Sequence, residues 1–193
     1  MEPLRTVAGR AYPLGRPDVD TDTILPAAYL KTITRTGLAR GAFEALRRTP
    51  GNVFDDPAFA GAPILIAGAN FGCGSSREHA AWALLDLGIR AVIAPSFADL
   101  FASNAFKNGI VTVELSQPSV DRLTAVARGG TLRVDLETMT VTSSTSDAFA
   151  FTMDPFRRES LLLGRDEIAL TLGSEAAIAR HEASGVVEPI VAL

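Results

Sequence analysis

The sequence predicts an α/β fold in which a mixed, partly parallel sheet is flanked by helices. An apolar run at 63–67 leads through a glycine-rich loop into a helical pattern at 76–87, and a second apolar run follows at 90–94. Such a strand–helix–strand unit makes its two strands parallel. A further helix and a strand at 110–115 repeat the arrangement. The length of 193 residues suffices for one domain with a substantial core, and we expect a single domain over 1–193.

The other expected elements lie on either side of this centre. Weak periodicity and glycine-flanked ends predict a mobile loop at 27–38, and an acidic, turn-rich segment at 18–23 predicts a second loop. The C-terminal tail after Pro155 reads as three short helical pieces, broken at Gly164 and Gly173. The remaining predictions are a strand at 6–12, helices at 38–48 and 119–128, paired strands at 131–136 and 139–143, and a surface turn at 143–146.

Composition excludes several classes of function. Lys and Arg total 18 against 22 Asp and Glu, so the net charge is −4, which is unlike a nucleic-acid-binding surface. The longest apolar runs are too short to span a membrane, and residues 1–5 lack the apolar core of a signal peptide. Cys73 is the one cysteine, so an internal disulfide is excluded, and this thiol alone cannot hold zinc or an iron–sulfur cluster. A reducing, cytoplasmic location is expected.

The segment 68–79, with the sequence GANFGCGSSREH, is the most informative part of the chain. It lies where a predicted strand passes into a predicted helix. The free backbone N–H groups of a first helical turn favour an anion. The guanidinium of Arg77 suits a carboxylate or phosphate, and a serine hydroxyl could act on a bound acid if another group activates it. The segment therefore predicts an anion site.

A purely structural reading of this segment is also open. Ser75 and Glu78 match a capping box, in which the serine caps the helix and the glutamate reaches back. A cap does not require the three preceding glycines Gly68, Gly72 and Gly74, however. Glycines at this spacing favour a loop that approaches a ligand or turns sharply.

Two other functional readings fit less well. The glycine spacing is not that of a dinucleotide site, no acidic residue follows the next strand, and no Gly-Lys-Ser/Thr sequence is present for a P-loop. A nucleophilic Cys73 with His79 as its base is possible, but a small residue in a tight loop and a packed or capping histidine are the simpler readings. His181 is expected to be solvated.

The motif 72–79 resembles the small-subunit signature of the aconitase superfamily, above all that of its isopropylmalate isomerase branch. Further segments resemble the family in the expected order and cover nearly the whole chain. These are Val19–Pro26, Tyr29–Thr32, Arg35–Gly37, Ala94–Asp99 with Asn104, Phe156–Arg158, Leu163–Gly164 and Asp166–Leu172.

The resemblance implies a single swivelling β/β/α domain that docks on a large subunit, and a [4Fe-4S] cluster carried by that partner as a Lewis acid. It implies a hydro-lyase of leucine biosynthesis that isomerises 2-isopropylmalate to 3-isopropylmalate by dehydration and rehydration. Ser75 matches the catalytic base, Arg77 a clamp for a substrate carboxylate, and Ser76 a neighbour that supplies a hydrogen bond. Arg10 matches a second clamp more weakly, with a surface arginine as the alternative.

A serine base needs strong support, because a helix N-terminus contributes only about 0.3–1 kcal/mol to a nearby anion. Several backbone donors, Arg77 and a dry cleft must act together, so the chain is expected to be inactive without its partner. For selectivity we expect Leu30 and Ile33 to form part of an apolar pocket, with Lys31 and Thr32 at its polar edge. The alternative is that Tyr29 and Leu30 are ordinary core anchors.

Two further functions stay open at this point. The same chemistry could act on homoaconitate, methylmalate or dimethylmalate instead. A non-catalytic anion-binding or interaction module that kept the fold is the alternative of another class.

Overall fold

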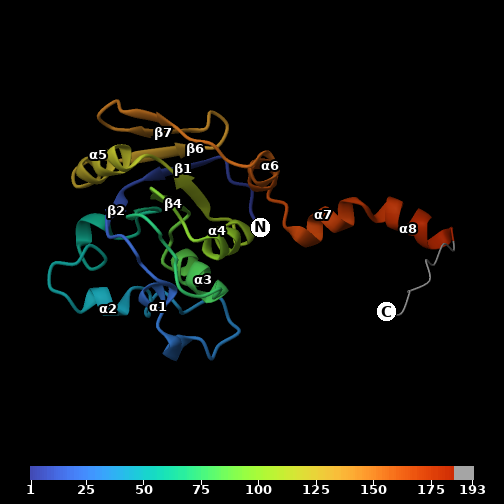
Figure 1. The fold of residues 1–193 in the computed structure, drawn as a ribbon, viewed down its shortest axis with the longest axis horizontal. Coiled ribbons are helices and arrows are strands. Elements are labelled where there is room, and N and C mark those ends of the chain that lie inside the picture. The colour runs from blue at the N-terminus through green and yellow to red at the C-terminus, as the bar shows by residue number, and fades with distance from the viewer. Residues whose placement is uncertain (185–193) are drawn as a thin grey trace.

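Three layers build the protein, as Figure 1 shows for the computed structural model, which describes residues 1–184. The first layer is an antiparallel sheet, the second is a parallel sheet, and helices form the third. The antiparallel sheet has the order β1 (Thr6–Gly9), β6 (Leu132–Asp135), β7 (Thr140–Ser143) and β8 (Ala148–Ala150). The parallel sheet has the order β2 (Ala11–Pro13), β3 (Ile64–Ile66), β4 (Ala91–Ala94) and β5 (Val111–Glu114).

The parallel sheet is the centre of the molecule because helices and a second sheet cover its two faces. Every residue of β2, β3 and β4 is buried, as expected for strands enclosed on both faces. Helices α3 (Glu78–Asp86) and α4 (Asp99–Lys107) connect successive strands of this sheet, and α5 (Gln117–Ala127) follows its last strand. The strand–helix–strand unit predicted from the sequence is therefore confirmed.

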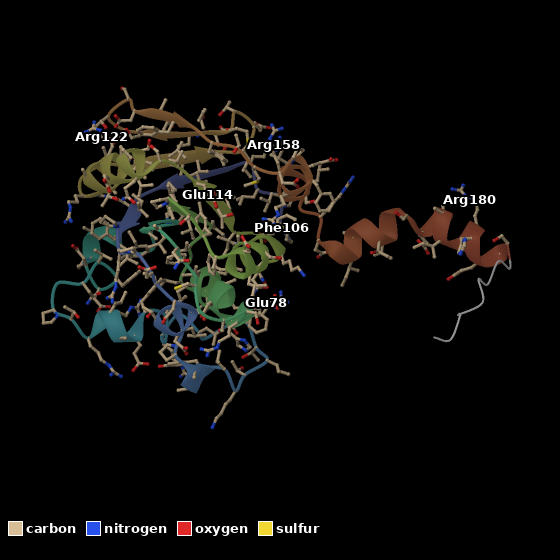
Figure 2. The ribbon with its side chains drawn as sticks, viewed as in Figure 1. Glu78, Phe106, Glu114, Arg122, Arg158 and Arg180 are labelled. Carbon is tan, nitrogen blue, oxygen red and sulfur yellow. The ribbon has the colours of Figure 1, made fainter. Side chains whose placement is uncertain are left out.

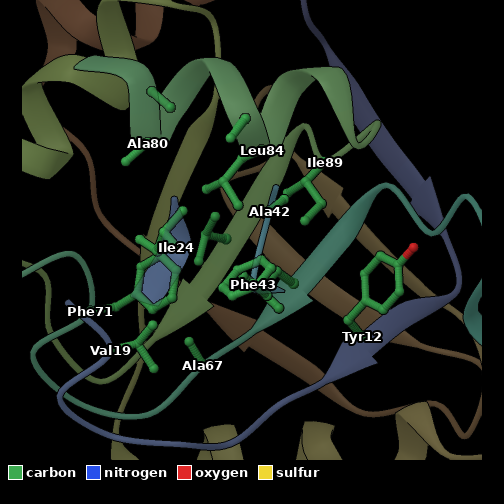
Figure 3. Packing of buried hydrophobic residues seen from close by; sticks show 14 of the residues in the cluster. Tyr12, Val19, Ile24, Ala42, Phe43, Ala67, Phe71, Ala80, Leu84 and Ile89 are labelled. Atoms are coloured by element: carbon green, nitrogen blue, oxygen red, sulfur yellow. The ribbon is translucent and has the colours of Figure 1, made fainter. Parts of the chain in front are cut away.

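Two apolar clusters fill the spaces between the layers. The cluster between the sheets includes Val7, Ile66 and Val134 together with residues of α5. The other cluster lies between the parallel sheet and α3, and Figure 3 shows Phe71 and Leu84 within it. Because alternate residues of β3 enter opposite clusters, the short run Ile64–Ile66 joins both cores.

The remaining helices are short or peripheral. Helix α1 (Thr21–Ile24), α2 (Glu44–Arg47) and two 3₁₀ turns at Ala27–Tyr29 and Pro57–Phe59 surround the helical layer. The tail forms α6 (Pro155–Leu163), α7 (Glu167–Gly173) and α8 (Glu175–Ala183), which confirms the three predicted pieces. Helices α7 and α8 extend away from the body, and Figure 2 shows Arg180 on this extension. Within residues 1–184, no helix has the length and apolar character needed to cross a membrane.

Several predicted elements differ from the observed ones. The strand expected at 6–12 is two strands in different sheets, separated at Arg10, next to Gly9 with its φ of +152°. The expected helix at 38–48 is helical only over Glu44–Arg47, and the loop expected at 18–23 contains the start of α1. The α/β class with flanking helices is confirmed, while the parallel and antiparallel strands belong to separate sheets. The single domain over 1–193 stays a prediction, and its residues 185–193 lie outside the described part of the chain.

Candidate active site

Three loops meet at one edge of the parallel sheet. Parallel strands end at the same edge, so the segments that follow β2, β3 and β4 are neighbours there. The central one, after β3, carries the motif 68–79. This is the edge at which open α/β sheets bind ligands.

Backbone hydrogen bonds join the central loop to the loop after β2. The amide of Gly72 donates to the Val19 carbonyl at 2.8 Å, and the amide of Thr21 donates to the Cys73 carbonyl at 2.9 Å. On the other side, the Phe71 amide donates to the Ser96 carbonyl at 3.1 Å. The parallel pairing thus continues beyond the strands, which fixes the course of the backbone leading to Ser75.

Ser75 and Thr21 form the centre of the candidate site. Their hydroxyl oxygens are 2.8 Å apart, and the Ser75 amide donates to the Thr21 hydroxyl oxygen at 3.3 Å. Thr21 is buried, whereas Ser75 is half-buried and so partly accessible. With an amide hydrogen already directed at its oxygen, the Thr21 hydroxyl can direct its own proton toward Ser75.

Arg77 lies next to this pair and is bound to Asp22 through one terminal nitrogen. The Arg77 side chain is 29% exposed and Asp22 is more exposed still. A guanidinium has five N–H donors, so Arg77 retains donors for a ligand carboxylate. Helix α3 begins at Glu78 and its N-cap residue is Arg77, so Ser75 does not cap this helix.

The predicted capping box is therefore wrong. Glu78 accepts hydrogen bonds from Asn108 Nδ2 at 2.8 Å and from Trp82 Nε1 at 3.2 Å instead of reaching back to residue 75. With its carboxylate held along the helix, Glu78 leaves Ser75 free of a capping role. The hydrogen bonds of the Ser75 side chain and amide go to Thr21 instead.

Asp20 places a negative charge beside the loop cluster. Its carboxylate caps α1 by accepting the Thr23 amide at 2.6 Å. Hydrogen bonding by Thr23 is the largest cause that holds the pKa of Asp20 below its usual value. Burial opposes it, and the charges of Arg77 and Arg16 make smaller contributions in the lowering direction. Asp20 is thus ionised at neutral pH and balances part of the positive charge of the site.

The thiol of Cys73 is a poor candidate nucleophile. Burial, and then the negative charges of Asp20 and Asp18, raise the pKa of Cys73 above its usual value. A thiolate is needed for nucleophilic attack, so the environment favours the inert form. The structure supports the simpler reading, a small residue in a tight loop.

Glycine occupies the three positions Gly68, Gly72 and Gly74 of the motif for different reasons. A Cβ on Gly68 would lie 2.4 Å from the Pro17 nitrogen, and one on Gly72 would lie 2.2 Å from the Phe101 ring. Packing accounts for Gly68, and packing together with a φ of +79° accounts for Gly72. Gly74 has a φ of +95° and is exposed, with only ordinary contacts around a notional Cβ. The left-handed backbone accounts for Gly74 as a sharp turn, so none of the three glycines by itself requires a ligand.

The predicted selectivity segment lies along α3. Leu30 is half-buried and, like Tyr29, packs against the apolar cluster between the parallel sheet and α3. Lys31 and Ile33 are exposed, Ile33 at 94%. The Thr32 carbonyl contacts His79 Nε2 at 3.0 Å. The mobility expected of loop 27–38 stays a prediction.

Two predicted residues differ in their relation to Ser75. Ser76 is exposed beside it, and its carbonyl accepts Asn104 Nδ2 at 3.0 Å. Arg10 is exposed but precedes β2, at the sheet edge opposite to the loop cluster, so the structure does not bring it to Ser75.

Sequence reasoning did not single out Thr21 and Asp22, which contact Ser75 and Arg77 in the structure. Both lie in the Val19–Pro26 segment that carries the family resemblance, but nothing local in the sequence shows that this segment pairs with residue 73. His181 is exposed, as expected.

This chain does not have the donor set for an iron–sulfur cluster. Its single cysteine is half-buried, and such clusters need several thiolates. Among the described residues 1–184, no three His, Cys, Asp or Glu side chains gather in a way that could hold a metal ion.

Comparisons with known proteins agree with this architecture. A family model described as the aconitase C-terminal domain matches residues 1–118. The 3-isopropylmalate dehydratase small subunit of Erythrobacter litoralis is 66% identical over 182 residues, covering 94% of this chain and 91% of that protein. The protein of the same name from Novosphingobium aromaticivorans is 62% identical over 183 residues, covering 95% and 91%. A crystal structure of 3-isopropylmalate dehydratase from Methanocaldococcus jannaschii has a TM-score of 0.72 at 26% identity, covering 91% of this chain and 99% of that one.

The three layers, the carboxyl-edge loops and the family match place this chain in the aconitase C-terminal domain family. Within that family it belongs with the 3-isopropylmalate dehydratase small subunits, a group of hydro-lyase subunits. The predicted family is thereby confirmed.

Proposed function

We propose that this chain, together with a large subunit, catalyses the interconversion of 2-isopropylmalate and 3-isopropylmalate in leucine biosynthesis, with Ser75 as base and Arg77 as carboxylate clamp. The observation that carries the proposal is the Ser75–Thr21 hydroxyl pair at 2.8 Å beside Arg77. It lies at the ligand-binding edge of the sheet, in a chain 66% identical to a protein named as this small subunit.

The proton transfer is assigned to Ser75. As an alkoxide, its oxygen takes a proton from the carbon next to one substrate carboxylate. The electron pair of that C–H bond forms a carbon–carbon double bond, and the hydroxyl on the adjacent carbon departs as hydroxide. This hydroxide and the proton now on Ser75 together account for the water that is eliminated. Returning the proton and the hydroxyl to exchanged carbons gives the isomer, so the atoms balance over the cycle.

The Ser75 alkoxide needs donors, and Thr21 is the nearest one. An oxyanion donor placed in advance is worth about 2.7–4 kcal/mol in a dry site. The Thr21 hydroxyl and the positive charge of Arg77 supply part of this stabilisation, and exclusion of water by the partner strengthens both contributions. Because Ser75 is half-buried in this chain, the dry cleft is assigned to the docked complex.

Arg77 is assigned to hold one carboxylate of the substrate. A guanidinium fork binds a carboxylate through two parallel hydrogen bonds. Asp22 occupies one terminal nitrogen in this structure, and its exposed carboxylate can turn away when substrate arrives. Until then, Asp22 keeps the Arg77 guanidinium directed at the site.

The cluster is proposed to belong to the large subunit, since this chain lacks the ligands for it. The name of the relatives, "small subunit", supports a larger partner. Selectivity for the branched side chain is assigned to the segment Leu30–Ile33, with Lys31 and Thr32 at its polar edge. Homoaconitate, methylmalate and dimethylmalate are the alternative substrates of the same chemistry.

The test is reconstitution. The purified chain is assayed with 2-isopropylmalate alone, and again after anaerobic co-expression with the large subunit. We expect turnover only from the pair. Turnover by the single chain would contradict the division of the site, and a stable pair that turns over no malate would favour the non-catalytic module.

The selectivity segment has its own test, the Leu30→Ala variant of the pair. Shortening an apolar side chain that lines a pocket weakens binding of a substrate methyl or isopropyl group by about 1–3 kcal/mol. We expect kcat/KM for isopropylmalate to fall about tenfold or more, and that for a malate lacking the branch to change little. An equal fall for both substrates would mean that Leu30 is a core anchor, as its half-buried packing also permits.

A further inference from the structure

One face of α3 holds the segment 32–39 at three points. His79, Trp82 and Asp86 lie at positions i, i+3 and i+7 of the helix, which share a face. His79 Nε2 contacts the Thr32 carbonyl oxygen at 3.0 Å, and the Arg35 guanidinium carbon lies 5.1 Å from the centre of the Trp82 ring. The Asp86 carboxylate accepts the amide of residue 39 at 2.7 Å.

The three contacts hold different parts of the segment. The contact at Asp86 holds the end where the chain re-enters the core, since Leu38 is buried there. The contact at His79 holds the other end, directly after Lys31. The hydroxyl of Thr32 bonds within the segment, to the Thr34 amide at 3.0 Å. The backbone carbonyl of Thr32 is therefore the group by which α3 holds the proposed selectivity residues.

His79 is itself held in orientation. Its ring lies 4.5 Å from the Trp82 ring at an interplanar angle of 48°. The indole Nε1 of Trp82 donates to Asn108 Oδ1 at 3.1 Å, and also to the carboxylate of Glu78 at 3.2 Å. Figure 2 places Glu78 at the start of α3. Asn108 and Glu78 thus hold the Trp82 ring, the Trp82 ring packs against the His79 imidazole, and the imidazole contacts the Thr32 backbone.

We propose that His79 is a positioning residue for substrate selectivity. It donates its Nε2 hydrogen to the Thr32 carbonyl. Because Ser75 lies only four residues before His79 in the chain, this bond fixes the position of Leu30–Ile33 relative to Ser75. The inference rests on the proposed function of that segment. His79 touches neither substrate nor reacting atoms; it acts through the loop. The positioning role does not require His79 to act as a base for Cys73, which was the alternative considered from the sequence.

The proposal predicts a separation of kinetic constants. A loop that recognises an unreacting branch binds the ground state and the transition state alike, so its loss raises KM and leaves kcat unchanged. His79→Leu removes the donor, whereas His79→Gln keeps an N–H group at a similar reach. The second histidine offers a matched control, because His181 is exposed on α8, far from this contact.

The experiment measures all three variants in the assembled enzyme and in the isolated chain. With the large subunit, we expect His79→Leu to raise KM for 2-isopropylmalate about tenfold with kcat within about twofold, and to change KM for a malate lacking the branch less. His79→Gln should restore most of the loss, and His181→Leu should match the native enzyme. In the isolated chain, amide hydrogen exchange in 32–36 should quicken about fivefold in His79→Leu alone.

The outcomes separate the inference from the proposed function. Unchanged exchange in 32–36, or an equal loss of stability and kcat in the Leu and Gln variants, would overturn the positioning role. If the native pair acts on another malate, the proposed substrate fails, and exchange together with KM for that malate still decides the role of His79. Faster exchange without any change in KM would also overturn it, because the loop would then be held but would not select.

Discussion

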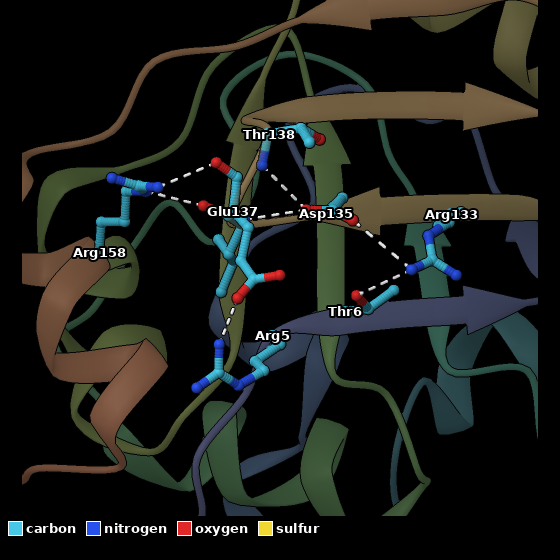
Figure 4. A network of polar contacts seen from close by, with 8 residues as sticks. Arg5, Thr6, Arg133, Asp135, Glu137, Thr138 and Arg158 are labelled. Atoms are coloured by element: carbon cyan, nitrogen blue, oxygen red, sulfur yellow. Dashed lines mark hydrogen bonds and ion pairs between the residues drawn. The ribbon is translucent and has the colours of Figure 1, made fainter.

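Two arginines of this protein are bound in opposite ways. Arg158, on α6, donates its Nε to the Leu136 carbonyl at 2.7 Å and a terminal nitrogen to the Glu137 carbonyl at 3.0 Å, as Figure 4 shows. These acceptors belong to the backbone of the turn between β6 and β7. Arg77 is bound through one terminal nitrogen to the exposed side-chain carboxylate of Asp22. The first arginine fastens two elements together, and the second is held in place with donors to spare.

The difference shows how to separate structural from functional polar groups without a bound ligand. Backbone acceptors cannot turn away, so a guanidinium that they engage is committed to the fold. A flexible carboxylate can leave, so its partner can exchange it for a substrate carboxylate at little cost, since an exposed ion pair is worth only about 0–1 kcal/mol. The predictions below test whether this division holds.

The largest effect is expected at Ser75. Ser75→Ala removes the proposed base, and general acid–base catalysis contributes about 10²–10⁴-fold. We expect kcat of the reconstituted enzyme to fall about 10³-fold, with KM changed little, in a steady-state assay of both directions. The unfolding free energy should fall by only about 1 kcal/mol, the worth of the hydrogen bond to Thr21.

Ser76→Ala is the matched control for that change. Ser76 is exposed and its proposed contribution is one hydrogen bond, so we expect a loss of about tenfold in kcat/KM. Equal losses at the two serines would contradict the assignment of the base to Ser75.

The next effect sets the two arginines against each other. Arg77→Lys keeps the charge but removes the fork, and a hydrogen bond to a charged group is worth about 1.5–3 kcal/mol, so kcat/KM should fall about 10- to 100-fold with little change in stability. Arg158→Lys should lower the unfolding free energy by about 1–2 kcal/mol and leave kcat/KM within about twofold. Urea unfolding and kinetics on both variants make the measurement. A reversed pattern would show that the mode of binding does not separate the two roles.

Much of the fold follows from local patterns in the sequence. The units around β3 and β4 were predictable because buried parallel strands are continuous apolar runs that alternate with helical patterns. The break at Arg10 was not, because residues 6–12 read as one strand, and the split depends on which sheet each half joins. The segment 38–48 has a helical pattern, but Phe43 adopts a left-handed conformation with φ of +56°, which confines the helix to Glu44–Arg47. Tertiary packing decides both cases.

The site divides in the same way. The position of Ser75 and Arg77 between a strand and a helix could be inferred from residues 63–87 alone. The contacts of Thr21 and Asp22 with them could not, since 54 and 55 residues separate the partners and only the pairing of the loops after β2 and β3 joins them. The close packing of Gly68 and Gly72 could not be inferred for a related reason, because their neighbours Pro17 and Phe101 are also distant in sequence.

The smallest expected effect concerns two carboxylates, Asp20 in the candidate site and Asp147 in the antiparallel sheet. Arg122, with the hydroxyls of Thr145 and Ser143, lowers the pKa of Asp147 to about 2. The pKa of Asp20 is also lowered, first by Thr23. A lowered folded pKa stabilises the fold above the unfolded value of about 3.9, and the contribution is lost as pH falls through the folded value.

Asn caps a helix as well as Asp, so Asp20→Asn removes the charge and keeps the cap. We expect the unfolding free energy to fall by about 0.3–1 kcal/mol at pH 7, from the helix dipole and the nearby arginines. The difference in unfolding free energy between the variant and the native chain should shrink below pH about 4 and vanish once Asp20 is protonated. For Asp147→Asn the difference should persist to lower pH, down to about 2. Urea unfolding of the three chains between pH 2 and 7 measures both limits. If the difference in unfolding free energy between Asp20→Asn and the native chain does not depend on pH, the charge of Asp20 does not contribute to stability. That result would contradict a stabilising electrostatic interaction between Asp20 and Arg77.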